Sequence, residues 1–416
     1  MLTQEENELL TRVGPGTPGG EMLRRYWHPV ALAEEITEDR PKMRVRILGE
    51  ELVLYRDLKG GYGLLGEHCS HRGTSLYYGF LEEEGIRCAY HGWLYDQDGR
   101  CIEQPFEPAQ SLMKHTLRHP AYPVQELAGL LFAYMGPPEK RPLLPRWDVV
   151  AWEDGTRKLA RHQVLDCNWV QAEENTADVT HTYFLHGHMS KLMGLPGADY
   201  YYRAIEQFGF QPFEWGLVKS WRYADDGGRF GAEHGGGNPL LFPNMLRLTS
   251  GPTNSIHWRV AIDDPHTQIF TCMFLRNGAE SHFQRGGDTV TQYKNDDGDF
   301  PVDTFPSQDA MAWETQGAIF DRTREHLGAS DTGVMLFRQL LREQIERVQR
   351  GEDPMALVRD PERNQLIELP GWIVEGDPEV VAKHGGPTAK VALWEDVYDN
   401  RHQIYEVPFG KARPRS

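Results

Sequence analysis

The chain lacks the features that would place it at a membrane or on a nucleic acid. Its 416 residues contain no run of about 18 apolar residues, the length that a membrane-spanning helix needs. The acidic start, Met1-Leu2-Thr3-Gln4-Glu5-Glu6, lacks the basic and apolar segments of a signal peptide. Basic residues are in the minority, with 44 Lys and Arg against 61 Asp and Glu and a net charge of −17, whereas a nucleic-acid interface is basic. We therefore expect a cytoplasmic protein that binds neither membranes nor nucleic acids.

Cysteine is scarce, with five residues in the whole chain. Cys101, Cys167 and Cys272 are widely spaced and odd in number, which is typical of buried free thiols in a reducing compartment rather than of a disulfide framework. The other two cysteines, Cys69 and Cys88, each lie close to a histidine in the sequence. These two are therefore candidates for metal binding.

Two short segments carry the first metal-binding pattern. Cys69-Ser70-His71 and Cys88-Ala89-Tyr90-His91 are separated by 16 residues, and each offers one thiolate and one imidazole. Two cysteines and two histidines are the ligand set of a Rieske [2Fe–2S] centre, in which histidine replaces the thiolates on one iron. We expect Gly73, Gly92 and Gly99 to allow tight turns, and Tyr90 and Trp93 to shield the cluster from water.

A zinc site is the alternative for these four residues, because Zn²⁺ also accepts two cysteines and two histidines. Zinc fingers and ribbons usually group cysteine with cysteine and histidine with histidine. Here each segment contains one of each residue type, so each segment can give one ligand to each iron of a binuclear cluster. The order of the residues therefore favours the iron–sulfur centre.

A second pattern follows within residues 168–188, for which we predict a helix. It reads Asn175-x₂-Asp178-x₂-His181-x₄-His186. Asp178 and His181 are one turn apart, so Asp178 is well placed to accept a hydrogen bond from the imidazole of His181 and to orient it. His181 and His186 are five residues apart, which is about 140° around an ideal α-helix. Both can reach one metal only if the helix is distorted near His186, where Gly187 makes a distortion plausible.

Two histidines and one carboxylate form the facial triad that holds Fe(II) and leaves coordination positions open. We predict that Asp309 supplies the carboxylate, from the start of a predicted helix in Ser307-Gln308-Asp309-Ala310-Met311-Ala312-Trp313-Glu314. Asp303 and Asp321 are its competitors. His188 is a rival to His186 that the spacing disfavours.

The length of the chain exceeds the size at which a single core keeps growing, so we expect two domains. We predict a helical segment over residues 1–40, with a capping box from Thr3 to Glu6 and a second short helix around Glu21 to Trp27. A small β-rich, metal-binding domain should span residues 41–145. It includes a hairpin formed by 43–48 and 51–56 and further strands at 62–65 and 130–134. The Gly- and Pro-rich segment 136–142 is the predicted linker to a second metal-binding domain over residues 146–416.

The two metal motifs together resemble the terminal oxygenase component of the Rieske non-haem iron oxygenases, in the phthalate-dioxygenase-like branch that lacks a small β subunit. The resemblance runs from Val13-Gly14-Pro15-Gly16-Thr17 to residues 321–328. It implies an α+β protein with an N-terminal all-β Rieske [2Fe–2S] domain and a C-terminal helix-grip (START-like) domain, an antiparallel sheet with helices. Strand-like segments for that sheet are 200–223, 240–248, 256–262 and 269–275.

The resemblance also implies roles for individual residues. Cys69 and Cys88 would bind one cluster iron and His71 and His91 the other, while His181, His186 and Asp309 would bind the mononuclear Fe(II). Asp178 would link the catalytic iron to His91 of a neighbouring subunit, which requires a homotrimer or a hexamer. Asn175 corresponds to a residue near the iron that is not usually a strong ligand.

The implied reaction uses O₂ and a small aromatic, carboxylated substrate, by ring hydroxylation or dihydroxylation or by oxidative O-demethylation. No flavin or nicotinamide fingerprint and no plant-type ferredoxin cysteine run occurs in the chain. A separate NAD(P)H-dependent reductase, with or without a ferredoxin, must therefore supply the electrons. Arg203, Arg247 and Arg259 are candidates for binding a carboxylate. The alternative function is a Rieske electron-transfer protein whose helix-grip domain binds a ligand without catalysis.

Overall fold

The structure is a computed structural model. It describes residues 1–108, 110–195, 198–223, 238–250, 253–276, 292–370 and 405–408. The C-terminal part of the predicted second domain, 371–404 and 409–416, lies outside these residues. Among the helices described, none is both long enough and apolar enough to cross a membrane.

The N-terminal segment is only partly helical. Helix α1 (Gln4–Thr11) starts with the predicted capping box, in which the Thr3 hydroxyl accepts from the Glu6 backbone N–H and the Glu6 carboxylate accepts from the Thr3 N–H. Helix α2 (Pro18–Leu23) ends earlier than predicted. The expectation of a helix reaching Trp27 was wrong, because Trp27 begins strand β1 (Trp27–Leu32), which pairs with the later strand β11 (Leu130–Tyr134). This long-range pairing overrides the local helical preference.

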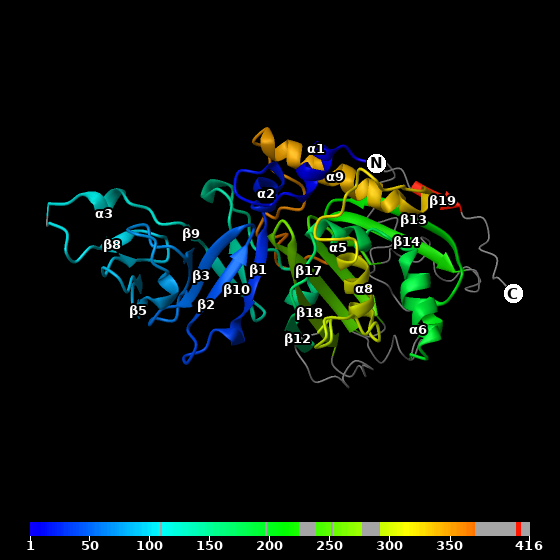
Figure 1. The fold of residues 1–416 in the computed structure, drawn as a ribbon, viewed down its shortest axis with the longest axis horizontal. Coiled ribbons are helices and arrows are strands. Elements are labelled where there is room, and N and C mark those ends of the chain that lie inside the picture. Colours follow the sequence, from blue (N-terminus) through cyan, green and yellow to red (C-terminus); the bar gives the residue numbers. More distant parts are fainter. Residues whose placement is uncertain are drawn as a thin grey trace.

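Three small antiparallel sheets make up the N-terminal β region. One has the order β1-β11-β10. The second has the order β2-β3-β4-β9 and includes the predicted hairpin, and the third has the order β5-β6-β7-β8. The third sheet lies at the far tip of the molecule, next to the short helix α3 (Figure 1). The bounds of the strands not yet given are β2 (Lys42–Ile47), β3 (Glu50–Arg56), β4 (Tyr62–Gly66), β5 (Phe80–Glu82), β6 (Gly85–Arg87), β7 (Leu94–Tyr95), β8 (Cys101–Glu103), β9 (Ala121–Tyr122) and β10 (Val124–Leu127).

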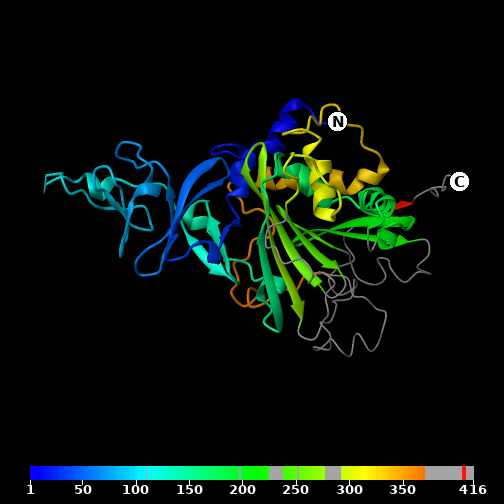
Figure 2. The ribbon, with the colours of Figure 1, turned by 60° about the horizontal axis from the view of Figure 1, so that its bottom comes forward.

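The C-terminal region is built on one antiparallel sheet with the strand order β12-β18-β17-β16-β15-β14-β13-β19. Figure 2 shows helices α5, α8 and α9 lying on one side of this sheet. The strands are β12 (Gly155–Arg161), β13 (Ile205–Phe213), β14 (Gly216–Tyr223), β15 (Leu240–Leu241), β16 (Met245–Ser250), β17 (Thr253–Asp263), β18 (His266–Arg276) and β19 (Tyr405–Pro408). The bounds of the helices not yet given are α3 (Met113–Thr116) in the N-terminal β region, and α4 (Asp148–Ala151), α5 (Trp169–Thr176), α6 (Met189–Leu192), α7 (Ala198–Tyr201), α8 (Phe305–Glu314) and α9 (Thr332–Gln349) in the C-terminal region. This sheet with its helices agrees with the expected α+β fold class.

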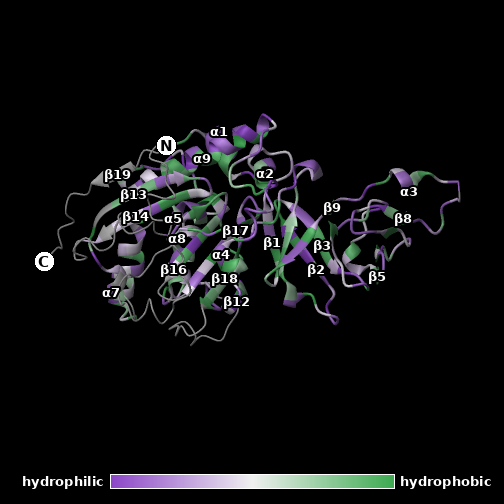
Figure 3. Ribbon diagram, turned by 180° about the vertical axis from the view of Figure 1, so that it is seen from behind, coloured by the Kyte–Doolittle hydropathy of each residue, from purple (hydrophilic) through white to green (hydrophobic). Residues whose placement is uncertain are grey.

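The central strands have two faces with different surroundings. Successive side chains of a strand point to opposite faces. In β17, Ile256, Trp258 and Val260 join a large apolar core that continues into the N-terminal β region. The opposite face of the sheet meets α5 and α8 through a second core, which contains Ile269, Tyr293, Trp313 and others. Figure 3 shows hydrophobic and hydrophilic residues alternating along the strands, as this two-faced arrangement requires.

The N-terminal β region contacts the large sheet directly. The backbone N–H groups of Leu48 and Gly49, at the turn between β2 and β3, donate to the carbonyl oxygens of Ala261 and Ile262 at 3.0 and 2.8 Å. The apolar core is also continuous between the two regions, so the sheets β1-β11-β10 and β2-β3-β4-β9 pack directly against the large one.

The predicted helix over residues 168–188 is interrupted. Helix α5 ends at Thr176, and a π-helix follows over Thr182–His188. The strand predicted over 200–223 is likewise divided, because its first residues form α7 and the rest form β13 and β14. The three later strand predictions are confirmed in β15 to β18.

Candidate metal centres

The two cysteine–histidine segments form two loops with the same backbone hydrogen bonds. In the first loop the Gly73 N–H donates to Cys69 O at 2.8 Å, and in the second the Gly92 N–H donates to Cys88 O at 3.0 Å. Both glycines have φ of 75°, a left-handed conformation that favours glycine over other residues. The Cys69 and Cys88 N–H groups in turn donate to Thr74 O and Trp93 O, each one residue after the loop glycine. Two equivalent turns can therefore present ligands from two sides of one cluster.

The side chains of the loops divide into an inner pair and an outer pair. Cys69 and Cys88 are buried, at 3% and 2% exposure. The rings of His71 and His91 lie nearer the surface, with centroids 4.5 Å apart. Trp93 stacks on His71 at a centroid distance of 4.3 Å, and Tyr90 covers His91 at 3.7 Å. This arrangement fits a cluster whose thiolate-bound iron is inside and whose histidine-bound iron faces outward.

Tyr95 is a further neighbour of this site that the sequence motifs did not identify. Its phenolic oxygen lies 3.2 Å from Cys69 Sγ, and the side chain is buried. A cysteine bound to iron is a thiolate and can only accept, so the phenol would donate this hydrogen bond. The remaining cysteines, Cys101, Cys167 and Cys272, are buried and form no disulfide, as expected.

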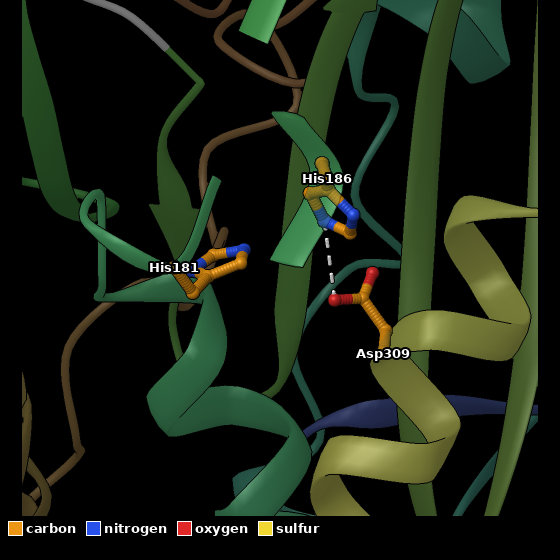
Figure 4. Close-up of side chains that lie close together, drawn as sticks. All are labelled: His181, His186 and Asp309. Carbon is orange, nitrogen blue, oxygen red and sulfur yellow. Dashed lines mark ion pairs between the residues drawn. The ribbon is translucent and has the colours of Figure 1, made fainter. Parts of the chain in front are cut away.

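A second group of potential ligands lies on the large sheet's helical side. One ligand atom each of His181, His186 and Asp309 lies within 4.8 Å of the other two. Figure 4 shows the three side chains converging from two different elements, with Asp309 on α8. His186 Nε2 is 3.3 Å from Asp309 Oδ1. Two imidazoles and one carboxylate in this geometry fit an iron held on one face.

The π-helix explains how two histidines five residues apart meet. In an α-helix they would lie about 140° apart. The wider i→i+5 turn of a π-helix brings residues five apart onto the same side, and His181 directly precedes this segment. Glycine at position 187 allows the backbone of this segment to pack closely against that of Tyr202, because a Cβ there would lie 2.6 Å from Tyr202 N. It is not required for a left-handed φ angle. The expected distortion is thus present, as a π-helix rather than as unwinding.

Each histidine of this group has its Nδ1 atom tied to a neighbouring acceptor. His181 Nδ1 is 3.0 Å from Asp178 Oδ2, as predicted. His186 Nδ1 is 2.9 Å from Gln308 Oε1. With Nδ1 donating in this way, Nε2 of each ring is free to bind a metal. Gln308 was missed by sequence reasoning, because only the position of α8 gives it this role.

Two more residues hold this site in place. Asn175 Nδ2 donates to Asp309 Oδ1 at 3.4 Å, which joins α5 to α8. The ammonium of the buried Lys219, on β14, donates to the carbonyl oxygens of Thr176 and Asp178 at 2.8 and 3.2 Å. Lys219 therefore satisfies the carbonyl groups at the end of α5 and fixes the start of the segment that contains Asp178 and His181.

The charges of the site are coupled. Burial acts to raise the pKa of Asp309, but His186, together with His181 and Arg259, outweighs burial and lowers it. Burial also acts to raise the pKa of Asp178, yet hydrogen bonds from His181 and Thr180 lower it well below its usual range. Both carboxylates are therefore anionic at neutral pH, which suits one to bind a metal and the other to orient an imidazole.

The competing residues lie elsewhere. Asp303 is exposed, and Asp321 is exposed and accepts from Thr323. The ring of His188 packs against Tyr202 and is not part of the group. Of the three candidate arginines, Arg203 stacks on Tyr223. Arg247 forms a buried ion pair with Asp148, and Arg259 faces α5.

Comparison with known proteins agrees with this geometry. The Rieske [2Fe-2S] domain family matches residues 26–123, and a family described as LigXa C-terminal domain like matches residues 274–369. The chain is 40% identical over 380 residues to the 5,5'-dehydrodivanillate O-demethylase oxygenase subunit of a Sphingobium species, covering 89% of this chain and 87% of that protein. It is 42% identical over 385 residues to the phenoxybenzoate dioxygenase subunit alpha of Ectopseudomonas oleovorans, covering 86% and 89%.

Solved structures show the same fold at lower identity. The Pseudomonas putida CBB5 protein NdmA, determined with caffeine, superimposes with a TM-score of 0.62 at 17% identity, covering 86% of this chain and 99% of that chain. The relatives are oxygenases, which disfavours the alternative of an electron-transfer protein without catalysis. The chain belongs to the Rieske non-haem iron oxygenases, as a terminal oxygenase subunit that uses a [2Fe–2S] cluster and a mononuclear iron.

Proposed function

We propose that this oxygenase subunit oxidises a small aromatic, carboxylated substrate, by ring hydroxylation or dihydroxylation or by oxidative O-demethylation. The observation that carries the proposal is the convergence of His181, His186 and Asp309 on the helical side of the large sheet. Three ligands on one face leave room for O₂ and for a substrate on the other. Relatives named as an O-demethylase and as a phenoxybenzoate dioxygenase support an aromatic substrate.

The proposed ligand assignment follows the two groups of side chains. Cys69 and Cys88 hold one iron of the cluster, His71 and His91 hold the other, and His181, His186 and Asp309 hold the catalytic iron. When bound, the cluster supplies single electrons and the catalytic iron supplies open coordination positions. Asp178 and Gln308 keep the two imidazoles in the tautomer that presents Nε2 to the metal. Asn175 holds the carboxylate of Asp309.

We further propose that electrons reach the catalytic iron from the cluster of a neighbouring subunit. Within one chain the cluster loops lie near β5 to β8, at one tip of the molecule, while α5 and α8 lie in the other half (Figure 1). Asp178 would bridge His181 of its own chain and His91 of a neighbour. Contacts of this kind from each subunit to the next form a closed ring in a homotrimer or in a hexamer made of two trimers.

The domain boundaries belong to the same proposal: an N-terminal segment over 1–40, which holds α1, α2 and β1, a Rieske domain over 41–145 and a catalytic domain over 146–416. As the oxygenase component of a multicomponent system, the protein needs an electron-supplying partner. We propose an NAD(P)H-dependent reductase, with or without a ferredoxin, and a cytoplasmic location.

The test is product analysis with the complete system. The reduced protein, a reductase and O₂ are incubated with methoxybenzoates, phenoxybenzoates and phthalate, and the products are identified by mass spectrometry. Hydroxylated rings, diols or demethylated phenols support the proposal, and the product type decides between the reactions. Absence of any product from a protein with both metals loaded would contradict it. An Asp309→Ala protein serves as the control for background oxidation.

A further inference from the structure

A buried histidine outside both metal motifs contacts the first cluster loop. His119 lies between α3 and β9 and is 3% exposed. Its Nδ1 atom lies 2.7 Å from the hydroxyl of Ser70, the residue between the proposed ligands Cys69 and His71. Its Nε2 atom lies 2.7 Å from Gly66 O, at the end of β4. Both contacts are with the segment that leads from β4 into the first loop.

The two hydrogen bonds of His119 fix which ring nitrogen carries the proton. A carbonyl oxygen can only accept, so Nε2 carries a proton and donates to Gly66 O. Burial lowers the pKa of His119 more than the contact with Gly66 raises it, so the ring is neutral at neutral pH. Nδ1 is then an acceptor, and the Ser70 hydroxyl donates to it. The side chain of Ser70 is thus held by His119.

The backbone around His119 is fixed as well. The His119 N–H donates to Gly99 O at 2.8 Å, and the Gly66 N–H donates to Pro120 O at 2.9 Å. Gly99 has φ of 73°, and a Cβ there would collide with the His119 carbonyl oxygen, so this close approach needs glycine. The position of the imidazole is therefore set by backbone contacts on both sides of it and not by Ser70 alone.

His119 also contacts the tyrosine that reaches a cluster cysteine. The ring centroids of His119 and Tyr95 are 4.7 Å apart. Tyr95 is fully buried, and its phenolic oxygen lies 3.2 Å from Cys69 Sγ. One imidazole thus touches both sides of the contact between Tyr95 and Cys69: the tyrosine through its ring, and the cysteine loop through Ser70. The distance between the two partners therefore depends on the position of His119.

We propose that His119 is a positioning residue that holds the Tyr95 hydroxyl against Cys69 Sγ and thereby raises the reduction potential of the cluster. A hydrogen bond to a cluster sulfur stabilises the reduced state, and it weakens steeply when donor and acceptor move apart. The proposal rests on the proposed function, because it takes Cys69 as a cluster ligand. In it, His119 binds neither iron nor substrate and acts on the reaction through the energy of the electron that the cluster supplies.

The test measures the midpoint potential of the cluster in the full-length, cluster-loaded protein. Redox titration followed by EPR and circular dichroism gives this potential for each variant. His119→Phe keeps an aromatic ring beside Tyr95 but loses both hydrogen bonds of the imidazole, so its potential should be lower than that of the wild type. The equilibrium constant for reduction should fall about 3- to 10-fold, the range for one hydrogen bond, and 10-fold is about 59 mV for a one-electron couple.

Two further variants separate the contacts of His119. Ser70→Ala removes only the hydroxyl that donates to the imidazole, and it should also lower the potential. His119→Asn places an amide oxygen near the position of Nδ1, so it can still accept from Ser70 and should stay closer to the wild type than His119→Phe does. The double variant Ser70→Ala/His119→Phe should have the same potential as His119→Phe, because both changes remove the same contact.

The decisive comparison is made without the Tyr95 hydroxyl. In Tyr95→Phe the contact that His119 holds is already absent, so Tyr95→Phe/His119→Phe should have the same potential as Tyr95→Phe. His28→Asn is the matched control. His28 is a buried histidine on β1 whose Nε2 lies 2.8 Å from Leu23 O, so its replacement should lower the melting temperature and leave the potential unchanged.

Three results would overturn the proposal. The first is a potential equal to or above that of the wild type in both His119→Phe and Ser70→Ala. The second is a shift of full size from His119→Phe in the Tyr95→Phe background, which would assign the effect to solvent entry or to a looser loop. The third is an equal shift in His28→Asn, which would assign it to lost stability.

If His119→Phe does not take up a cluster, Ser70→Ala with and without the Tyr95 hydroxyl gives the same comparison. The failure of this inference is distinct from that of the proposed function. A wild type without a Rieske EPR signal refutes the proposed cluster ligands. A wild type with that signal, together with unchanged potentials in the variants, refutes this inference alone.

Discussion

The carboxylate of Asp178 lies 3.0 Å from Nδ1 of His181 and also accepts the His181 backbone N–H at 3.1 Å. Its other oxygen accepts from both the backbone and the hydroxyl of Thr180. The carboxylate of Asp178 is thus held by these local contacts, while it fixes the orientation and the tautomer of one proposed iron ligand. The same carboxylate is the proposed contact to His91 of a neighbouring subunit.

Asp178→Asn should slow electron transfer to the catalytic iron while both metals stay bound. Asparagine keeps the size of the side chain but lacks the charge that stabilises the imidazole, and such changes typically reduce activity by about 10- to 100-fold. In single-turnover experiments with substrate and O₂, the reduced cluster of the variant should persist while that of the wild type is oxidised. Asp199→Asn, an exposed aspartate paired with Lys191, is the control. Wild-type rates of cluster oxidation in Asp178→Asn would contradict the proposed route.

His181→Ala, His186→Ala and Asp309→Ala should each lose the mononuclear iron and turnover, and the cluster spectrum should remain unchanged. Each variant removes one of the three proposed ligands, while the proposed cluster ligands lie in a different part of the fold. Metal analysis together with EPR of the reduced cluster measures both effects. Asp303→Ala, Asp321→Ala and His188→Ala are controls that should keep the iron. Full activity in Asp309→Ala would move the carboxylate role to another residue.

Tyr95→Phe should lower the reduction potential of the cluster without changing its assembly. The Tyr95 hydroxyl lies 3.2 Å from Cys69 Sγ, and a hydrogen bond to a cluster sulfur stabilises the more negative, reduced state. Redox titration followed by EPR or circular dichroism gives the potential. Tyr90→Phe is the control, because Tyr90 is exposed and contacts His91 through its ring. An unchanged potential in Tyr95→Phe would show that this contact does not act on the cluster.

Glu174→Gln should destabilise the protein by about 3–5 kcal/mol, the usual cost of breaking a buried ion pair from one side. The Glu174 carboxylate pairs with Arg322 at 2.8 Å and with Arg338 at 2.6 Å, and all three side chains are buried. These contacts join α5 to α9 and to the segment before it. Denaturant midpoints compare the variant with wild type, and Glu352→Gln, in an exposed pair, should change stability by less than about 0.5 kcal/mol.

The ion pairs of Glu174 with Arg322 and Arg338 also make the stability of the protein depend on pH. Burial acts to raise the pKa of Glu174, but Arg322 and Arg338 outweigh it, so the folded-state pKa lies below the reference value of 4.5. A carboxyl group whose pKa is lower in the folded state than in the unfolded state stabilises the fold at pH values above the unfolded-state pKa. This stabilisation is lost as the pH falls through the folded-state pKa. The difference between wild type and Glu174→Gln should therefore shrink below about pH 4.5.

Lys219→Met should weaken iron binding more than it lowers overall stability. Lys219 holds the carbonyl oxygens of Thr176 and Asp178, and methionine would leave both without this donor. The backbone between the end of α5 and the π-helix would then be held less firmly. His181 lies in this segment, so its imidazole would be positioned less precisely for the metal. Iron affinity, measured by competition with a chelator, should fall about 10-fold or more. Lys191→Met, at an exposed pair, is the control, and equal iron affinity in both variants would contradict the prediction.

The sequence by itself determined the parts of this protein that depend on neighbouring residues. The two cysteine–histidine segments are short, and each loop closes with hydrogen bonds over four or five residues, so their spacing was sufficient to indicate a cluster. The capping box of α1 and the contact between Asp178 and His181 are local in the same way. The hairpin of β2 and β3 also follows from alternation and a turn within one segment.

Only the tertiary structure decided the features that join distant segments. A run that reads as one helix became α5 and a π-helix, because Lys219 from β14 and the backbone near Tyr202 act on it from outside. Trp27 entered a strand because β11 pairs with it. The pairing of Glu173 with Arg259 arises where a helix packs on a strand, and no spacing in the sequence encodes it. Local hydrogen bonds can be read along the chain, whereas contacts between elements depend on how the elements pack.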